Sequence, residues 1–148
     1  MELITGWEQF VDTHTVQVGD QQFTARQIMV AVGGRPQRLT IPGGELCWVS
    51  DDLFLQQDLP SSILIIGAGY IACEFACILR GLGVSVTQVV RGPRLLRGFD
   101  SELAEAVLDG MKEAGIHVIC NATLESVHRD QHQLTATLED GLQIPCGG

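Results

Sequence analysis

The stretch Ile63-Leu64-Ile65-Ile66-Gly67-Ala68-Gly69-Tyr70-Ile71-Ala72 determines the fold class of this chain. A buried apolar run is followed at once by the pattern G-x-G-x-x-[GA], and apolar residues at helical spacing continue to about Leu82. The pattern alone is weak, but strand, glycine turn and helix in this order are typical of a dinucleotide-binding βαβ unit. Gly67 would allow the tight turn, Gly69 would let a pyrophosphate approach the backbone, and Ala72 would let the helix pack on the strand.

The free amides at the start of this helix, together with the positive end of its dipole, would face the phosphates. The alternative is a glycine-rich turn that binds no ligand. Because the strand, the loop and the helix occur together, we favour the dinucleotide site.

The sequence after this unit predicts a three-layer α/β fold of the Rossmann type. A second strand is predicted over 84–90 and a third, buried strand over 116–120, and parallel strands crossed by helices form such a fold. A helix between them is capped by Asp100, ends at Gly115, and has a predicted buried stripe of Leu103, Val107, Met111 and Ala114. The period then changes to two over 123–127 and 134–138, with turns at 130–131 and 140–141, which predicts an antiparallel β-meander.

The first third of the chain has a different pattern. Short strands are predicted at 3–4, 15–18 and 22–24, followed by a strand over 27–32 that is buried on both faces and closed by Gly33-Gly34. Residues 37–60 are predicted to be a linker with one short helical turn that begins at Ser50. We therefore divide the chain into residues 1–36, the linker 37–60, and a nucleotide-binding domain over 61–148.

The loop after the second strand predicts which dinucleotide is bound. A site for NAD places a carboxylate at the end of this strand to accept hydrogen bonds from the ribose, but here the strand ends in Val89-Val90. The loop that follows, Arg91-Gly92-Pro93-Arg94-Leu95-Leu96-Arg97, holds three of the nine basic residues of an acidic chain. A guanidinium can bind a 2′-phosphate with two parallel hydrogen bonds. We predict NADPH, held by Arg91 and Arg97; a solvated loop is the alternative.

The composition excludes several classes of function. A net charge of −9 argues against binding to nucleic acid or to an acidic membrane, and no apolar run approaches the roughly 18 residues that a transmembrane helix needs. The five cysteines lack the spacing of a metal or redox pair, and no metal site is predicted from the histidines, including His128 and His132. We expect reduced thiols and a cytoplasmic protein.

Four stretches resemble one known family. Residues 67–76 (GAGYIACEFA) and 91–100 (RGPRLLRGFD) closely resemble the NADPH domain of glutathione reductases, which belong to the FAD-dependent pyridine nucleotide–disulfide oxidoreductases. Residues 6–12 and 31–36 resemble the part of the FAD-binding domain that precedes the NADPH domain. The resemblance covers nearly the whole chain, although Val32 stands where the family usually has threonine.

The resemblance implies roles for further residues. Ala68 and Ile71 would contact the dinucleotide, Tyr70 would lie over the nicotinamide pocket and move when NADPH enters, and Glu74 would face the nicotinamide. Glu8 would contact the adenosine of FAD through its backbone, and Val32-Gly33 would lie near the edge of the flavin domain.

The resemblance also implies a parent enzyme, a homodimer in which NADPH reduces FAD, FAD reduces a protein disulfide, and the dithiol reduces glutathione disulfide. Thioredoxin and trypanothione reductases have similar arginine loops, and a non-catalytic NADPH-binding module is a further alternative. The Cys-x4-Cys pair, the first FAD-binding glycine loop and the catalytic His–Glu pair of the family are not found in the 148 residues. We therefore expect an internal fragment, inactive by itself, whose NADPH domain lacks its last strand.

Overall fold

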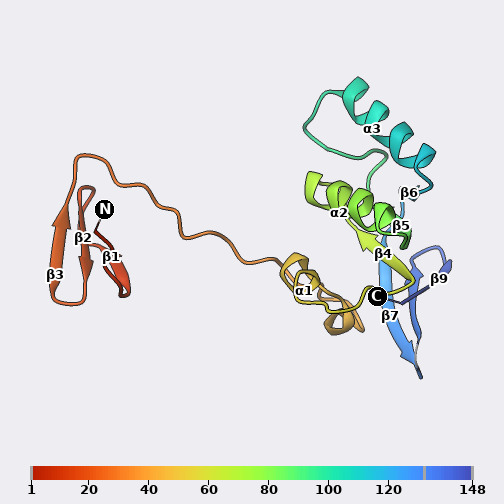
Figure 1. Cartoon of the computed structure of the whole chain (residues 1–148), viewed down its shortest axis with the longest axis horizontal. Helices are drawn as coiled ribbons and strands as arrows, with labels where there is room; N and C mark the ends of the chain where they lie inside the picture. Colours follow the sequence, from red (N-terminus) through yellow and green to blue (C-terminus); the bar gives the residue numbers. More distant parts are fainter. Residues whose placement is uncertain (1, 132, 148) are drawn as a thin grey trace. The chain divides into compact units, whose positions relative to one another are not determined.

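The computed structural model describes residues 2–131 and 133–147 (Figure 1). The chain divides into two compact units, residues 1–35 and residues 36–148. Unit 1 holds one small sheet, and unit 2 holds two further sheets and all of the helices. No helix among the described residues combines the length and the apolarity needed to cross a membrane.

Unit 1 is an antiparallel meander of three short strands, β1 (Glu8–Phe10), β2 (Thr15–Val18) and β3 (Gln21–Thr24). The turn between β1 and β2 is held by the Asp12 carboxylate, which accepts a hydrogen bond from the His14 amide at 2.7 Å. The predictions at 15–18 and 22–24 are confirmed. The predicted strand at 3–4 is wrong, because the first strand begins at Glu8.

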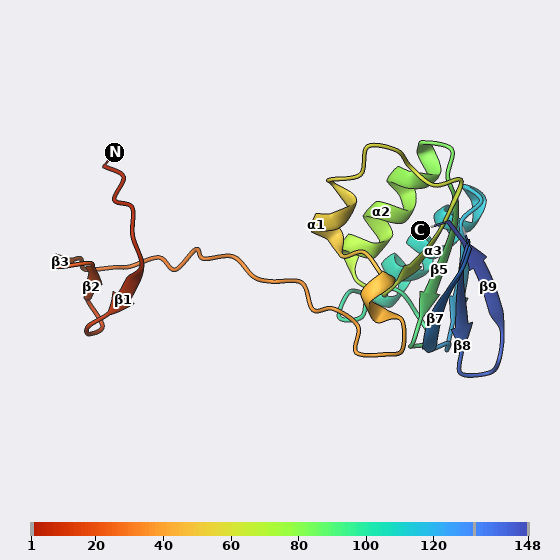
Figure 2. The same ribbon diagram turned by 90° about the horizontal axis from the view of Figure 1, so that it is seen from below.

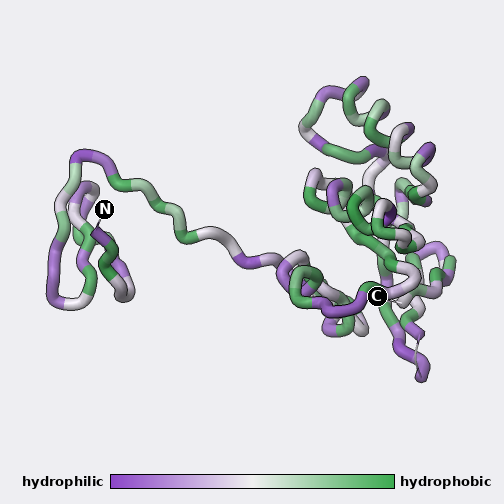
Figure 3. The backbone as a smooth tube through the Cα atoms, viewed as in Figure 1, coloured by the Kyte–Doolittle hydropathy of each residue, from purple (hydrophilic) through white to green (hydrophobic). Residues whose placement is uncertain are grey.

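The apolar run over residues 27–32 is not the buried strand that its composition predicts. It is extended but assigned to no strand, and Met29 and Val32 are 89% and 74% exposed. Figure 3 shows it as a hydrophobic segment that follows β3. A strand buried on both faces needs hydrogen-bonding neighbours on its edges and side-chain layers above and below it. None of the described strands of unit 1 pairs with this run, so the pattern alone does not make it a strand.

Unit 2 is built on a parallel sheet, as predicted. The strands β4 (Ser62–Ile66), β5 (Ser85–Val90) and β6 (His117–Cys120) lie in the order β4-β5-β6 and are connected by α2 (Tyr70–Gly81) and α3 (Ser101–Glu113). Both helices pack on one face of the sheet in a core that includes Ala76, Leu79, Val86 and Val90. The parallel order and the crossover helices confirm the α/β fold class.

The helix α3 begins where the sequence predicts, and its buried face agrees in part with the predicted stripe. The Asp100 carboxylate accepts hydrogen bonds from the amides of Glu102 and Leu103, which is the predicted N-cap. Ala104 and Met111 are buried, whereas Leu103 is 52% exposed, contrary to the predicted stripe. Val107 is partly buried, as predicted, whereas the predicted Ala114 is exposed, and Ala104 and Leu108 complete the buried face.

The third layer is the predicted antiparallel meander. It consists of β7 (Leu124–Asp130), β8 (Gln133–Leu138) and β9 (Gln143–Cys146), which pair in sequence order. Its inner residues, among them Val127, Ala136 and Leu138, form a second core with Val89 of β5 and with Leu64 of β4. Figure 2 shows the helices and this meander on opposite sides of the parallel sheet, which confirms the three-layer arrangement.

Residues 36–60 are part of unit 2 and not a free linker. This segment forms η1 (Gly44–Leu46) and α1 (Ser50–Leu53), and Ile41, Leu46 and Cys47 pack against the second core. The prediction of a linker failed because the apolar residues of this segment are scattered without a period, although Ile41, Leu46 and Cys47 are partly buried against the second core. The predicted helical turn at Ser50 is confirmed.

Gly43 fixes this segment to the meander. It has a φ of +77°, and a Cβ at this position would overlap the Val127 carbonyl. The adjacent Pro42 carbonyl accepts a hydrogen bond from the Val127 amide at 2.9 Å. The absence of a side chain therefore lets the segment lie directly on β7.

We predict that Gly43→Ala lowers the free energy of unfolding by about 2 kcal/mol or more, because the substitution strains φ and separates the segment from β7. The matched control is Gly110→Ala in α3, where an added Cβ would meet no atom of the described residues within 4 Å. This substitution should raise the free energy of unfolding by about 0.5–1 kcal/mol. Thermal unfolding followed by circular dichroism measures both. Equal stabilities of the two variants would show that the segment is not docked.

We also predict that Asp100→Ala costs about 1 kcal/mol, because two amides of the first turn of α3 lose their acceptor. The control is Asp109→Ala, an exposed position in the same helix, which should stay within about 0.5 kcal/mol of the unsubstituted chain. Urea unfolding measures this difference, and a cost no larger than that of the control would contradict the cap.

Candidate dinucleotide-binding site

The glycine loop turns the chain sharply between β4 and α2. Gly67 has a φ of +141°, in the region that favours glycine, and its amide donates to the Val89 carbonyl of β5 at 3.0 Å. Gly69 is the N-cap of α2, and a Cβ added to it would meet no atom of the described residues within 4 Å. The space next to the Gly69 Cα is therefore open, and a pyrophosphate could approach the backbone there.

The first turn of α2 leaves amides free for a ligand. Gly69 offers no side-chain cap, and its carbonyl accepts the bond from the Cys73 amide at 3.2 Å. No acidic residue lies in this first turn. Since the N-terminus of a twelve-residue helix carries partial positive charge, the loop fits the phosphates of a dinucleotide.

The arginine loop is anchored to the glycine loop. Leu95 is fully buried and Leu96 nearly so, and the Leu96 amide donates to the Ala68 carbonyl at 2.6 Å. At the other end of the loop, the Gly92 carbonyl accepts a bond from the Asn121 amide at 2.9 Å. The two loops that the sequence predicts to bind one cofactor are thus joined directly through their backbones.

The arginine side chains of this loop point into solvent. Arg91, Arg94 and Arg97 are exposed, and the side-chain hydrogen bonds and salt bridges found among the described residues do not include them. By contrast, Arg38 forms a bidentate pair with Asp52, at 2.9 and 3.2 Å. The charge of the arginine loop is therefore available to an anion, and Val90, at the end of β5, is fully buried and brings no carboxylate.

The other predicted site residues are at the surface and make no side-chain hydrogen bond among the described residues. Tyr70, Ile71 and Glu74 are exposed on the first turns of α2. In unit 1, Glu8 is exposed in β1, and Val32 and Gly33 are exposed in the extended segment, with Gly33 at a φ of +70°. Their contacts with cofactors stay predictions.

One residue of the site was missed by the sequence analysis. Gln88 of β5 is fully buried, and its Nε2 donates to the Gly67 carbonyl at 2.9 Å. The signal was present, because Gln88 is the polar residue on the face of β5 that carries Val86 and Val90. Beside it lies Cys73, and burial raises the pKa of this thiol, so it stays protonated at neutral pH.

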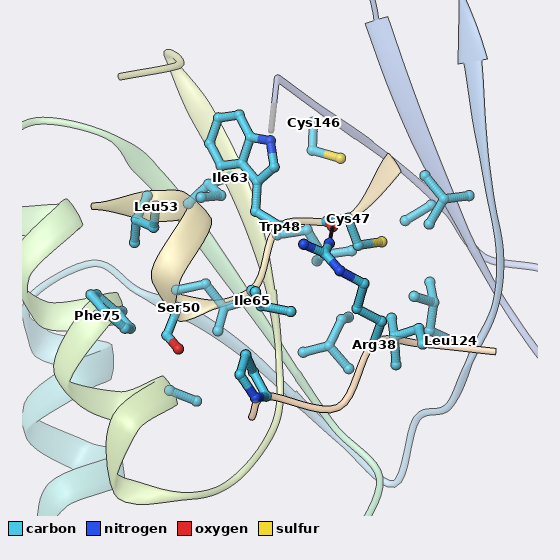
Figure 4. Close-up of a pocket in the computed structure, with 18 of the residues that line it drawn as sticks. Arg38, Cys47, Trp48, Ser50, Leu53, Ile63, Ile65, Phe75, Leu124 and Cys146 are labelled. Carbon is cyan, nitrogen blue, oxygen red and sulfur yellow. Dashed lines mark hydrogen bonds between the residues drawn. The ribbon is translucent and has the colours of Figure 1, made fainter. Parts of the chain in front are cut away.

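A cavity of about 410 Å³ lies along β4 in unit 2 and borders the glycine loop, since Gly69, Ile71 and Ala72 are among its lining residues. The residues labelled in Figure 4 come from the 36–60 segment, β4, α2 and the meander, and most of them are apolar. The one arginine in its lining is Arg38, which Asp52 already neutralises. A dinucleotide carries several negative charges, so its phosphates suit the exposed glycine and arginine loops better than the apolar part of this cavity.

Within the described ranges no group of three or more metal-ligating side chains is found. All five cysteines are free, and burial raises the pKa of the Cys47 and Cys146 thiols. The prediction for His132 lies outside the described residues. The glycine loop and the arginine loop of unit 2 therefore remain the candidate binding site.

Relatives of this chain share its sequence over nearly its full length. It is 41% identical over 145 residues to a glutathione reductase of Nostoc sp., covering 98% of this chain and 32% of the relative. It is 35% identical over 158 aligned positions to the mitochondrial thioredoxin reductase 2 of Drosophila melanogaster, covering 97% of this chain and 30% of the relative. The chain thus spans about a third of the length of these relatives.

A solved structure shows the same fold. The HOCl-induced flavoprotein disulfide reductase RclA of Escherichia coli matches 99% of this chain and 34% of its own, with a TM-score of 0.78 at 24% identity. The model of the pyridine nucleotide-disulphide oxidoreductase family matches residues 1–148. Because this match covers the whole sequence, the chain belongs to the pyridine nucleotide-disulphide oxidoreductase family.

Proposed function

We propose that unit 2 binds NADPH as the hydride donor of a flavoprotein disulfide reductase. The observation that carries this proposal is the 2.6 Å hydrogen bond from the Leu96 amide to the Ala68 carbonyl. It holds the arginine loop beside the glycine loop, so that one ligand can place its pyrophosphate on the first loop and its 2′-phosphate on the second. Only a phosphorylated dinucleotide uses both loops.

The charges of the site support NADPH over NADH. The 2′-phosphate would meet Arg91 and Arg97, which are exposed and carry no competing carboxylate partner among the described residues. NADH offers only a ribose hydroxyl there, and the buried Val90 at the strand end cannot accept a hydrogen bond through its side chain. A charge-assisted bidentate contact would therefore be made by NADPH alone.

Bound NADPH would supply a hydride to a flavin. The residues of this chain would bind and orient it. Amides of the glycine loop would hold the pyrophosphate, and the exposed Tyr70 and Glu74 at the start of α2 would border the nicotinamide. In unit 1, Glu8, Val32 and Gly33 would lie against FAD, as the family resemblance implies.

We propose glutathione disulfide as the substrate of the parent enzyme. The support is the identity of 41% to a glutathione reductase, against 35% to a thioredoxin reductase. The alternative is a thioredoxin- or trypanothione-type reductase, because the proposed NADPH site is compatible with each. We further propose that the parent enzyme is a cytoplasmic homodimer.

A non-catalytic NADPH-binding module is the second candidate. The two loops that would bind NADPH both lie in unit 2, so binding would not require a redox disulfide. Under this candidate the 148 residues bind NADPH but do not reduce a disulfide.

We predict that the purified chain binds NADPH, and that Arg91→Ala and Arg97→Ala each weaken binding at least about tenfold (1.4 kcal/mol) with little effect on NADH. The matched control is Arg129→Ala, an exposed arginine of β7 in the same unit, which should leave both affinities unchanged. A fluorescence titration of the cofactor measures all four proteins, with circular dichroism to show that each is folded.

Two results would contradict this assignment. Equal affinities for NADPH and NADH would mean that the arginine loop does not bind the 2′-phosphate. Failure of the folded, unsubstituted chain to bind either cofactor would mean that unit 2 does not form the site by itself.

A further inference from the structure

Gln88 is a polar residue in the centre of an apolar layer. Its side chain is fully buried on the face of β5 that also carries Val86 and Val90. Its Oε1 is buried without a hydrogen-bond partner among the described residues. An unpartnered buried acceptor destabilises a fold, whereas an apolar side chain of the same length would avoid that cost. The presence of glutamine here therefore needs a reason other than packing.

The orientation of the Gln88 amide is determined by the glycine loop. Nε2 lies 2.9 Å from the Gly67 carbonyl oxygen and 3.9 Å from the Cys73 sulfur. A flipped amide would place Oε1 against the Gly67 oxygen, and two acceptors would repel each other. The donor must therefore face Gly67, and this leaves Oε1 without a partner.

The bond to the Gly67 carbonyl also determines where the next amide points. A trans peptide is planar, with its C=O and N–H directed to opposite sides. Because Gln88 holds the Gly67 oxygen toward the interior of unit 2, the Ala68 N–H of the same peptide is directed away from the interior. Ala68 N donates none of the hydrogen bonds found in the described parts of the chain, so it is free for a ligand.

We propose that Gln88 is a positioning residue for the pyrophosphate, acting through the Gly67–Ala68 peptide. This inference rests on the proposed binding of NADPH and adds a residue to that site. The next peptide, Ala68–Gly69, is held as well, since the Ala68 carbonyl accepts the Leu96 amide at 2.6 Å. Gln88 thus aims the amide that receives the pyrophosphate, and Leu96 joins the same residue to the loop that receives the 2′-phosphate.

A purely structural role for Gln88 predicts different behaviour. If the side chain only stabilised the core, its replacement would lower the melting temperature. It would also weaken the binding of every ligand, in proportion to the fraction of the protein that is folded. A positioning role instead predicts a loss that depends on the pyrophosphate. Ligands without a pyrophosphate would bind as before, and the arginine loop would keep its affinity for a 2′-phosphate.

The experiment uses Gln88→Met, which keeps the length of the side chain and removes the donor, with Gln88→Leu as a second variant should the first not fold. The matched control is Thr87→Val, which removes a polar group from the opposite face of the same strand. Calorimetry measures binding of NADPH and of adenosine 2′-monophosphate, which has a 2′-phosphate but no pyrophosphate. The NMR signal of the Ala68 amide is followed in the same titrations.

We expect Gln88→Met to lower the affinity for NADPH by about five- to tenfold and to leave the affinity for adenosine 2′-monophosphate unchanged. The NADPH-dependent shift of the Ala68 amide signal should be lost. The melting temperature should not fall. Unchanged NADPH affinity in the folded variant, or an equal loss for both ligands, would overturn the inference. Failure of the unsubstituted chain to bind NADPH would instead overturn the proposed function on which the inference rests.

Discussion

The turn at Gly67 carries the chain from β4 into α2, and hydrogen bonds from three directions hold this loop. The Gly67 amide donates to Val89, its carbonyl accepts from Gln88, and the next carbonyl accepts from Leu96. These partners lie on β5 and on the loop that follows it, so three consecutive peptides of this turn are held by the sheet and by the arginine loop. The position of the start of α2, and of any phosphate bound there, depends on this turn.

The rest of unit 2 supports this turn from both faces of the parallel sheet. The helices pack on one face, and the meander packs on the other through a second core that includes Val89. The 36–60 segment closes against the meander because Gly43 has no side chain. The apolar layers therefore fix the strand ends, while the polar and charged groups of the two loops remain at the surface.

Much of this arrangement could be predicted from the sequence, and the failures have physical causes. The glycine pattern, the cap at Asp100 and the change of period after residue 120 are local signals, and each is confirmed. The run over 27–32 has a strand's composition but no pairing partner in the described structure, which no local pattern reveals. Gln88 was missed because its role arises from a contact with a residue distant in sequence, Gly67.

The central claim is that one nucleotide lies across both loops of unit 2. A crystal structure of the chain with NADP⁺ tests it most directly. The account predicts the pyrophosphate on the amides that follow Gly67 and the 2′-phosphate between Arg91 and Arg97. A nucleotide bound instead in the apolar cavity along β4, or with its 2′-phosphate away from the arginine loop, would contradict the account.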